Sequence, residues 1–199
     1  MGFSGELVFG RSGHPLLSAS VFDGIDQSKD TVHVSWPRVG GWQTLQFGGD
    51  VIKKPEATLR ALVEWTGALA CVASVYDSDV AMVMGLGPEG ELWEACLNLE
   101  KAAGLWAEVP DDVDDMSEWI STPAFAEAVD RKRAELDAHV SGDAQGALDW
   151  ARSAGFAHSV TVASVQEVLR SGEVFVEELF DALLDRLGFP EAVDPESQR

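Results

Sequence analysis

The stretch of residues 68–97 constrains the fold of this chain more than any other. It opens with two runs that are almost free of charge, 68–76 and 80–86, separated by Asp77-Ser78-Asp79. Strands that are apolar on both faces are covered on both sides, so we expect these runs to lie inside a sheet. The three-residue connection is too short for a crossover, which makes the two strands antiparallel neighbours.

A glycine-rich segment follows, and it spells Gly85-Leu86-Gly87-Pro88-Glu89-Gly90. If a helix came next, this would be the G-x-G-x-x-G fingerprint of a dinucleotide site. That fingerprint offers backbone N–H groups to a pyrophosphate, but Pro88 has none, and Glu89 and Glu91 would place carboxylates beside the anion. We therefore favour a turn, with residues 91–97 as the next strand. Apolar residues recur there at helical spacing as well, so a helix remains the alternative.

The first fifty residues contain short runs rich in β-forming residues, separated by Gly-, Asp- and Ser-rich breaks. Three or four strands are predicted from the runs at 6–9, 18–22, 31–36 and 42–47. Polar and apolar residues alternate in the last two runs, which predicts a hairpin with one face in water. A helix is expected next, because Pro55 suits a first helical position and Gly67 suits a helix end.

Beyond Pro110 the apolar pattern becomes helical. One helix is predicted to begin at Thr122 and to end near Gly142, where Asp143 would cap a second helix. A capping-box pattern, Ser164 with Glu167, predicts the start of a third.

The last helix has the most regular apolar stripe in the chain. Its members recur three or four residues apart, and most acidic side chains fall on the other side. The stripe consists of Phe175, Val176, Leu179, Phe180, Leu183, Leu184 and Leu187. Such a stripe is typical of core packing, and the alternative is a dimerisation or partner-binding helix.

Together these patterns predict an α+β protein, with an antiparallel or mixed sheet and one packed helix, followed by an acidic helical region. Residues 111–199 hold seven basic and twenty acidic side chains, against seven and fourteen in residues 1–110. This difference predicts a boundary near Pro110. We expect the β-rich region 1–110 and the acidic region 111–199 to pack on each other as one compact unit.

The whole chain carries 14 basic and 34 acidic side chains, a formal net charge of −20. This excess opposes nonspecific binding to nucleic acid or to an anionic membrane, and it attracts a cationic partner. A compositional bias toward Asp and Glu is the competing explanation. The N-terminus has no basic segment followed by an apolar one, so a cytoplasmic protein is expected.

Asp77 and Asp79 form the candidate metal-binding pair. Two carboxylates at a tight turn suit a hard cation such as Mg²⁺ or Ca²⁺, or an acid/base pair. Turns also favour Asp because its side chain bonds the local backbone. A small-molecule or metal-dependent enzyme that uses this pair is the alternative hypothesis for function.

The densest acidic cluster lies directly after Pro110. It lacks the glycine and the final Glu of an EF-hand loop, so it predicts either a solvated loop or a docking surface for basic side chains. Trp is enriched at protein interfaces, which draws nearby Trp residues into the hypothesis. The predicted partner-binding residues are Asp111, Asp112, Asp114, Asp115, Trp106, Trp119, Glu177, Asp181 and Asp185.

No motif in the chain points to a cofactor or to one chemistry. The four histidines lack zinc-ligand spacing, and there is neither a Walker loop nor a G-x-S-x-G elbow. We therefore expect a noncatalytic binding protein without a cofactor, monomeric or homodimeric. Its most concrete form is an inhibitor or immunity-type protein that engages a basic protein partner. A helical dimerisation or scaffold module is the second alternative.

Overall fold

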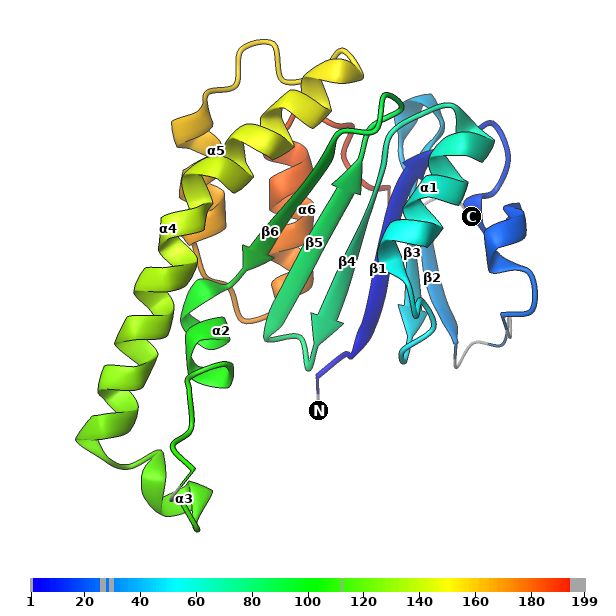
Figure 1. The fold of residues 1–199 in the computed structure, drawn as a ribbon. Helices are drawn as coiled ribbons and strands as arrows, with labels where there is room; N and C mark the ends of the chain where they lie inside the picture. The colour runs from blue at the N-terminus through cyan, green and yellow to red at the C-terminus, as the bar shows by residue number, and fades with distance from the viewer. Residues whose placement is uncertain (1, 26–27, 29–30, 112, 194–199) are drawn as a thin grey trace.

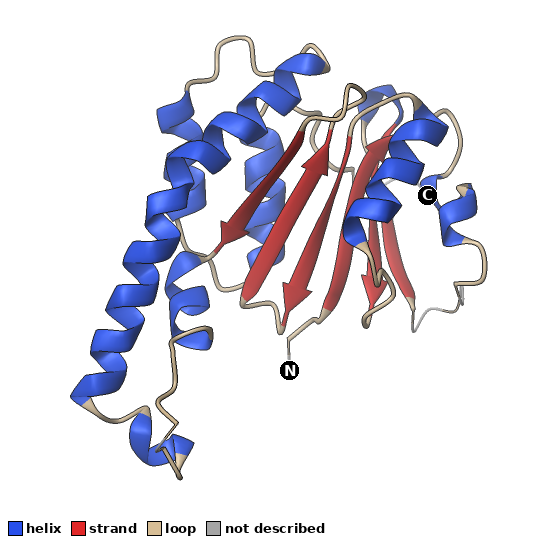
Figure 2. Ribbon diagram, in the orientation of Figure 1, coloured by secondary structure: helices blue, strands red, loops and turns tan. Residues whose placement is uncertain are grey.

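A computed structural model, which describes residues 2–25, 28, 31–111 and 113–193, shows an α+β fold built on one sheet (Figures 1 and 2). Within those residues the sheet has six strands in the spatial order β2-β3-β1-β4-β5-β6. The strands are β1 (Gly5–Arg11), β2 (Val32–Pro37), β3 (Trp42–Gly48), β4 (Ala70–Tyr76), β5 (Val80–Leu86) and β6 (Leu92–Leu97). The helices are α1 (Pro55–Thr66), α2 (Leu99–Leu105), α3 (Met116–Trp119), α4 (Pro123–Ser153), α5 (Val162–Arg170) and α6 (Val176–Arg186). Each strand pairing is antiparallel, so the predicted fold class is confirmed.

Residues 68–97, with which the sequence analysis began, form β4, β5 and β6 as two consecutive hairpins. Tyr76 pairs with Val80 in the first hairpin, and Leu86 pairs with Leu92 in the second. The G-x-G-x-x-G pattern therefore belongs to a hairpin rather than to a nucleotide loop. A side chain at Gly85 would place its Cβ 2.1 Å from an indole atom of Trp93, so packing accounts for that glycine.

Side-chain alternation along the strands builds two cores, one on each face of the sheet. On one face, α1 covers a cluster that includes Val8, Phe47 and Leu62 (Figure 1). Helices α4, α5 and α6 cover the larger cluster on the other face. There Phe9 stacks on Trp42, with 4.9 Å between the ring centroids. The larger core combines strands from before Pro110 with helices from beyond it.

The strand predicted at residues 18–22 is wrong. Residues 16–18 and 20–22 form two short 3₁₀ helices, and Phe22 donates its backbone N–H to Ala19 O. Leu16, Ala19 and Phe22 are all buried, and they recur at the three-residue period of a 3₁₀ helix. A strand would have alternated its buried residues with a period of two.

The break predicted at Gly142 and Asp143 is also wrong, because residues 123–153 form the single helix α4. An interior glycine costs about 1 kcal/mol relative to alanine. However, Ala144, Ala147 and Leu148 are fully buried on the larger core. Packing outweighs the local propensity at this point.

The helix caps agree with the sequence at one site and differ at another. Thr122 caps α4 as predicted, since its Oγ1 accepts a hydrogen bond from the backbone three residues on. Helix α5 begins earlier than the predicted capping box of Ser164 and Glu167, because Thr161 Oγ1 accepts the Ser164 N–H at 3.2 Å. The earlier start brings Val162 into contact with the larger core.

Helix α4 is long enough to extend beyond the sheet. Its 31 residues span about 46 Å, whereas a seven-residue strand spans about 23 Å. The C-terminal part packs on β6, and the N-terminal part projects below the sheet in Figure 1 together with α3. We call the projecting residues 106–132 the arm. Neither α4 nor any other described helix is apolar enough to cross a membrane.

Candidate protein-binding surfaces

A small apolar cluster holds the arm together. It contains Trp119, Ala107 and Ala128, and it is separate from the two cores on the sheet. Trp119 is only 7% exposed, and its ring meets Phe125 edge-on with 4.9 Å between the centroids. The sequence placed Trp119 in a partner surface, but its side chain lies inside the arm. It fixes α3 against the start of α4.

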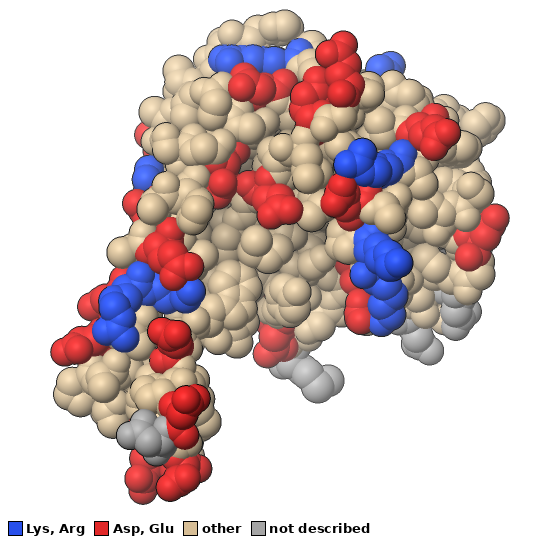
Figure 3. All heavy atoms as spheres, viewed as in Figure 1, with Lys and Arg blue, Asp and Glu red and all other residues tan. Residues whose placement is uncertain are grey.

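The predicted acidic cluster lies on this arm. Asp111 and Asp114 are exposed, and Asp112 lies outside the described residues. Asp115 caps α3, because its carboxylate accepts hydrogen bonds from the N–H and the hydroxyl of Ser117 at 2.8 and 2.7 Å. These hydrogen bonds lower the pKa of Asp115, so its charge persists to lower pH than usual. In Figure 3, acidic side chains gather at the end of the arm far from the sheet.

Four large apolar side chains near the acidic cluster in the chain are exposed to solvent. Met116 begins α3, and Ile120 caps its end one helical turn later. Leu105 ends α2, and Val109 lies between it and the acidic cluster. All four are between 43% and 58% exposed. Sequence analysis missed them, although the i, i+4 spacing of Met116 and Ile120 around the buried Trp119 was a usable signal.

Trp106 lies at the base of the arm, half-buried beside α4. It lines a groove of about 330 Å³ together with Glu108 and Lys132. The Lys132 ammonium pairs with Glu135 at 2.8 Å, and the guanidinium of Arg133 pairs with Glu100. These basic side chains are therefore partly neutralised within the chain and leave the end of the arm acidic.

The acidic side chains of α6 form a second surface, away from the arm. Asp181 and Asp185 lie 2.5 and 3.7 Å from the guanidinium of Arg38, whose side chain is fully buried. Arg38 also donates to the carbonyl of Pro190 at 2.8 Å and to Thr44 Oγ1 at 3.3 Å. Burial raises the pKa of Asp181 and of Asp185, and Arg38 opposes both shifts. Both carboxylates remain about half exposed, so their outer side faces solvent.

Glu177 belongs to α6 as well, but it contacts the β4–β5 turn. Its Oε1 accepts the hydroxyl hydrogen of Ser78 at 2.8 Å. The backbone of Ser78 in turn accepts the N–H of Val176 at 2.8 Å. The turn and the start of α6 are thus held together by neighbouring polar contacts. The structure therefore separates the predicted partner-binding residues into the arm and the α6 surface.

The candidate metal pair lies in the same turn, with its two carboxylates engaged differently. Asp77 accepts the N–H of Gly2 at 2.9 Å, whereas Asp79 pairs with the ammonium of Lys101. Both Asp77 and Ser78 have positive φ, which Asp tolerates better than most residues. Among the described residues, no group of three or more His, Cys, Asp and Glu side chains could hold a metal ion. These contacts connect the turn to the N-terminal segment and to α2.

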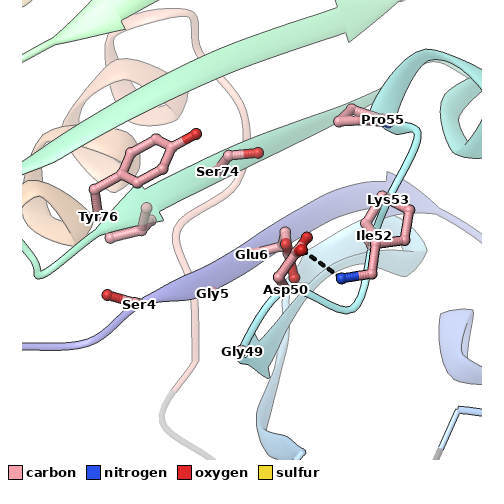
Figure 4. A pocket seen from close by; sticks show the side chains of 11 residues that line it. Ser4, Gly5, Glu6, Gly49, Asp50, Ile52, Lys53, Pro55, Ser74 and Tyr76 are labelled. Atoms are coloured by element: carbon pink, nitrogen blue, oxygen red, sulfur yellow. Dashed lines mark hydrogen bonds and ion pairs between the residues drawn. The ribbon is translucent and has the colours of Figure 1, made fainter.

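A cavity of about 520 Å³ lies at one end of β1 and β4 beside the loop that precedes α1. Figure 4 shows Glu6 and Asp50 beside each other, with Ser74 and Tyr76 of β4 on the other side. Glu6 is 4% exposed and accepts the Val51 N–H at 3.3 Å. Burial, with a contribution from Asp50, raises its pKa. The cavity thus places the buried carboxyl of Glu6 beside the exposed Asp50.

Sequence analysis missed Glu6 because a single acid at the start of a predicted strand resembles a solvent-facing residue. Its burial depends on the loop at residues 49–53, which folds over the strand end. No family model, curated protein or solved structure matches the chain.

Proposed function

We propose that this is a noncatalytic acidic binding protein that engages a basic protein partner through the arm. Its most concrete form is an intracellular inhibitor or immunity-type protein for a cationic toxin or nuclease. The observation that carries the proposal is the combination, on one projecting element, of exposed carboxylates at Asp111, Asp114 and Asp115 with exposed apolar side chains at Met116 and Ile120.

This combination matches the anatomy of protein interfaces, which have an apolar centre and a polar rim. Apolar groups supply the area removed from water on binding, and charges of one sign accelerate the encounter with a partner of the opposite sign. The net charge of −20 acts in the same direction at longer range. The arm projects beyond the sheet, so a partner can reach it from several sides (Figure 1).

The test is a comparison of two doubly substituted proteins with the same net charge. One carries Asp111→Lys and Asp114→Lys on the arm. The other carries Glu64→Lys and Glu89→Lys, two exposed side chains away from it. Each protein is used as bait in native lysate from its source, and the retained proteins are identified by mass spectrometry.

We expect a basic protein to be retained by the wild type and by the control, but not by the arm variant. With the purified partner, the association rate constant should be lower for the arm variant than for the control. A partner that binds both variants equally would show that the arm is not the interface. Retention of acidic or neutral proteins alone would contradict the predicted charge of the partner.

A further inference from the structure

A pocket on the α6 side of the sheet has a distinctive lining. Its volume is about 270 Å³, and it lies between the N-terminal half of α6 and strands β1, β2 and β3. Three aromatic rings and three carboxylates line it: Trp36, Phe175, Phe180, Glu177, Glu178 and Asp181. The lining contains no Lys, Arg or His.

Among the described residues, Arg38 is the one cation with an ion pair to this lining, and its donors are already engaged. The Arg38 guanidinium pairs with Asp181 and Asp185, and it donates hydrogen bonds to Pro190 O and Thr44 Oγ1. It also lies over the ring of Phe9, 5.5 Å from the centroid. The four carboxylates of Glu177, Glu178, Asp181 and Asp185 carry −4, and Arg38 contributes +1. The pocket and its border therefore keep a charge of −3.

One carboxylate oxygen is left without compensation inside this region. Glu177 Oε1 bonds to Ser78, but Oε2 is buried and accepts no hydrogen bond from the part of the chain that the structure describes. An unpaired buried acceptor costs about 1–3 kcal/mol, and more when it is charged. A bound cation would compensate this oxygen. Burial also raises the pKa of Asp181, although Arg38 lies beside it, so a second cation would favour the ionised form of that carboxyl as well.

The aromatic rings specify the kind of cation. Phe175 is about half exposed, and Trp36 is half-buried on the edge strand β2. Rings of this kind attract ammonium and guanidinium groups through their π faces, and they pack against methylene groups. A hydrated inorganic ion would gain little from them.

We infer that this pocket binds a guanidinium or ammonium group carried on a short aliphatic stem. Its volume lies just below the range of about 300–1,000 Å³ typical of drug-sized ligands, which suits one amino-acid side chain. An Arg or Lys side chain of a basic protein is the favoured source, and this choice of source rests on the proposed function. A free small amine is the other source of the same chemistry.

The experiment uses the full chain labelled with ¹⁵N, and it follows the indole N–H resonance of Trp36 during titration. The probes are N-acetylarginine amide, free arginine and N-acetylnorleucine amide, a neutral analogue with a similar stem. Trp150, buried in the larger core, provides a reference resonance. The same titrations are repeated with Glu178→Gln, which removes one lining charge, and with Glu89→Gln as a control far from the pocket.

N-acetylarginine amide should shift the Trp36 resonance and leave that of Trp150 in place, and the neutral analogue should shift neither. Glu178→Gln should weaken binding about 2- to 5-fold, and Glu89→Gln should leave it unchanged. Weaker binding of free arginine, which has a charged α-ammonium and α-carboxylate in place of the neutral amides of a peptide, supports a protein side chain as the source. Equal binding of the two arginine forms supports the pocket but assigns it to a small amine.

Two results would overturn the inference. One is the absence of any Trp36 shift with the arginine amide, and the other is an equal response to the neutral analogue. Because the probes are small molecules and the arm is unchanged, failure here leaves the proposed function standing. Conversely, loss of the arm-dependent partner leaves the pocket titration unaffected.

Discussion

Arg38 shows how much one side chain can connect in this fold. Its guanidinium joins the end of β2 to α6 and to the chain after it, across about 140–150 residues of sequence. The C-terminal segment also pairs with β2, since Val193 donates its N–H to Pro37 O at 2.9 Å. The sequence predicted the hairpin of β2 and β3, which the structure contains, but no local pattern identifies a partner so far away.

Replacing Arg38 with Met should destabilise the protein by about 2–4 kcal/mol, because Thr44 and Pro190 lose a buried donor and two carboxylates lose their cation. This expected loss of stability is at the lower end of the range for a broken buried ion pair, because water can still hydrate Asp181 and Asp185. Urea unfolding measures the change. Arg60→Met, at an exposed pair on α1, should stay within about 0.5 kcal/mol of the wild type. Equal stabilities of the two variants would contradict the role of Arg38.

The raised pKa of Glu6 predicts how the stability of the protein depends on pH. Burial raises its native pKa above the ordinary value of 4.5, so the native state binds its proton more tightly than the unfolded chain does. Its contribution to stability is complete below the unfolded pKa and is lost as the pH rises through the native pKa. Glu6→Gln keeps an acceptor for the Val51 N–H and cannot ionise. It should therefore be more stable than the wild type at neutral pH. The difference should shrink as the pH falls through the native pKa toward the unfolded value of about 4.5, and it should stay constant below that.

The measurement is the free energy of unfolding across a pH series, with the exposed Glu64→Gln as the control. The control should follow the wild-type curve in parallel. A Glu6→Gln protein whose stability changes with pH as steeply as that of the wild type would show that this carboxyl does not carry a raised pKa.

At the scale of elements, the strongest sequence signals predicted the central hairpins and α1, because each depends on short-range periodicity with a clear stop at a turn or at Gly67. The predictions were wrong where tertiary packing determines the secondary structure. Gly142 resembles a helix end in the sequence, but burial of the neighbouring alanines keeps α4 continuous. The arm was predicted as an acidic cluster, yet its projection depends on the length of α4. The sequence predicted two shorter helices separated at Gly142, so it did not predict the length of α4.

Two glycines of α4 offer a matched test of this packing. Gly142 has open space where a Cβ would lie, whereas at Gly146 a Cβ would stand 2.8 Å from Cβ of Trp93. Gly142→Ala should therefore stabilise the protein by about 0.5–1 kcal/mol through helix propensity alone. Gly146→Ala should destabilise it despite the same gain, because α4 and β6 must move apart. Thermal unfolding measures the stability of the two variants. A Gly146→Ala variant that is more stable than the wild type would contradict the close approach of α4 to β6.

The arm has its own small core, so it should lose structure independently of the sheet. Trp119→Ala removes the centre of that core, and amide hydrogen exchange should accelerate in residues 106–129 while β4 and β5 keep their protection. Trp65→Ala, at a largely exposed position on α1, should leave exchange in the arm unchanged. Uniform acceleration across the chain in Trp119→Ala would show that the arm and the sheet unfold as one.

At the scale of the whole molecule, the charge of −20 has two consequences with opposite responses to salt. Like charges repel within the folded chain, so screening should stabilise it. Screening should also slow association with a basic partner, because it removes the long-range attraction. The boundary predicted near Pro110 stays a prediction. The larger core includes residues from both sides of it.

Raising NaCl from about 0.05 to about 0.5 M should therefore raise the melting temperature while it lowers the association rate constant with the partner. Because the two changes have opposite signs, slower binding in salt cannot result from unfolding. The rate constant of the Asp111→Lys, Asp114→Lys protein should depend less steeply on salt than that of the Glu64→Lys, Glu89→Lys protein, although the two have the same net charge. If the two slopes are equal, the attraction arises from the overall charge, and the arm has no special part in steering the partner.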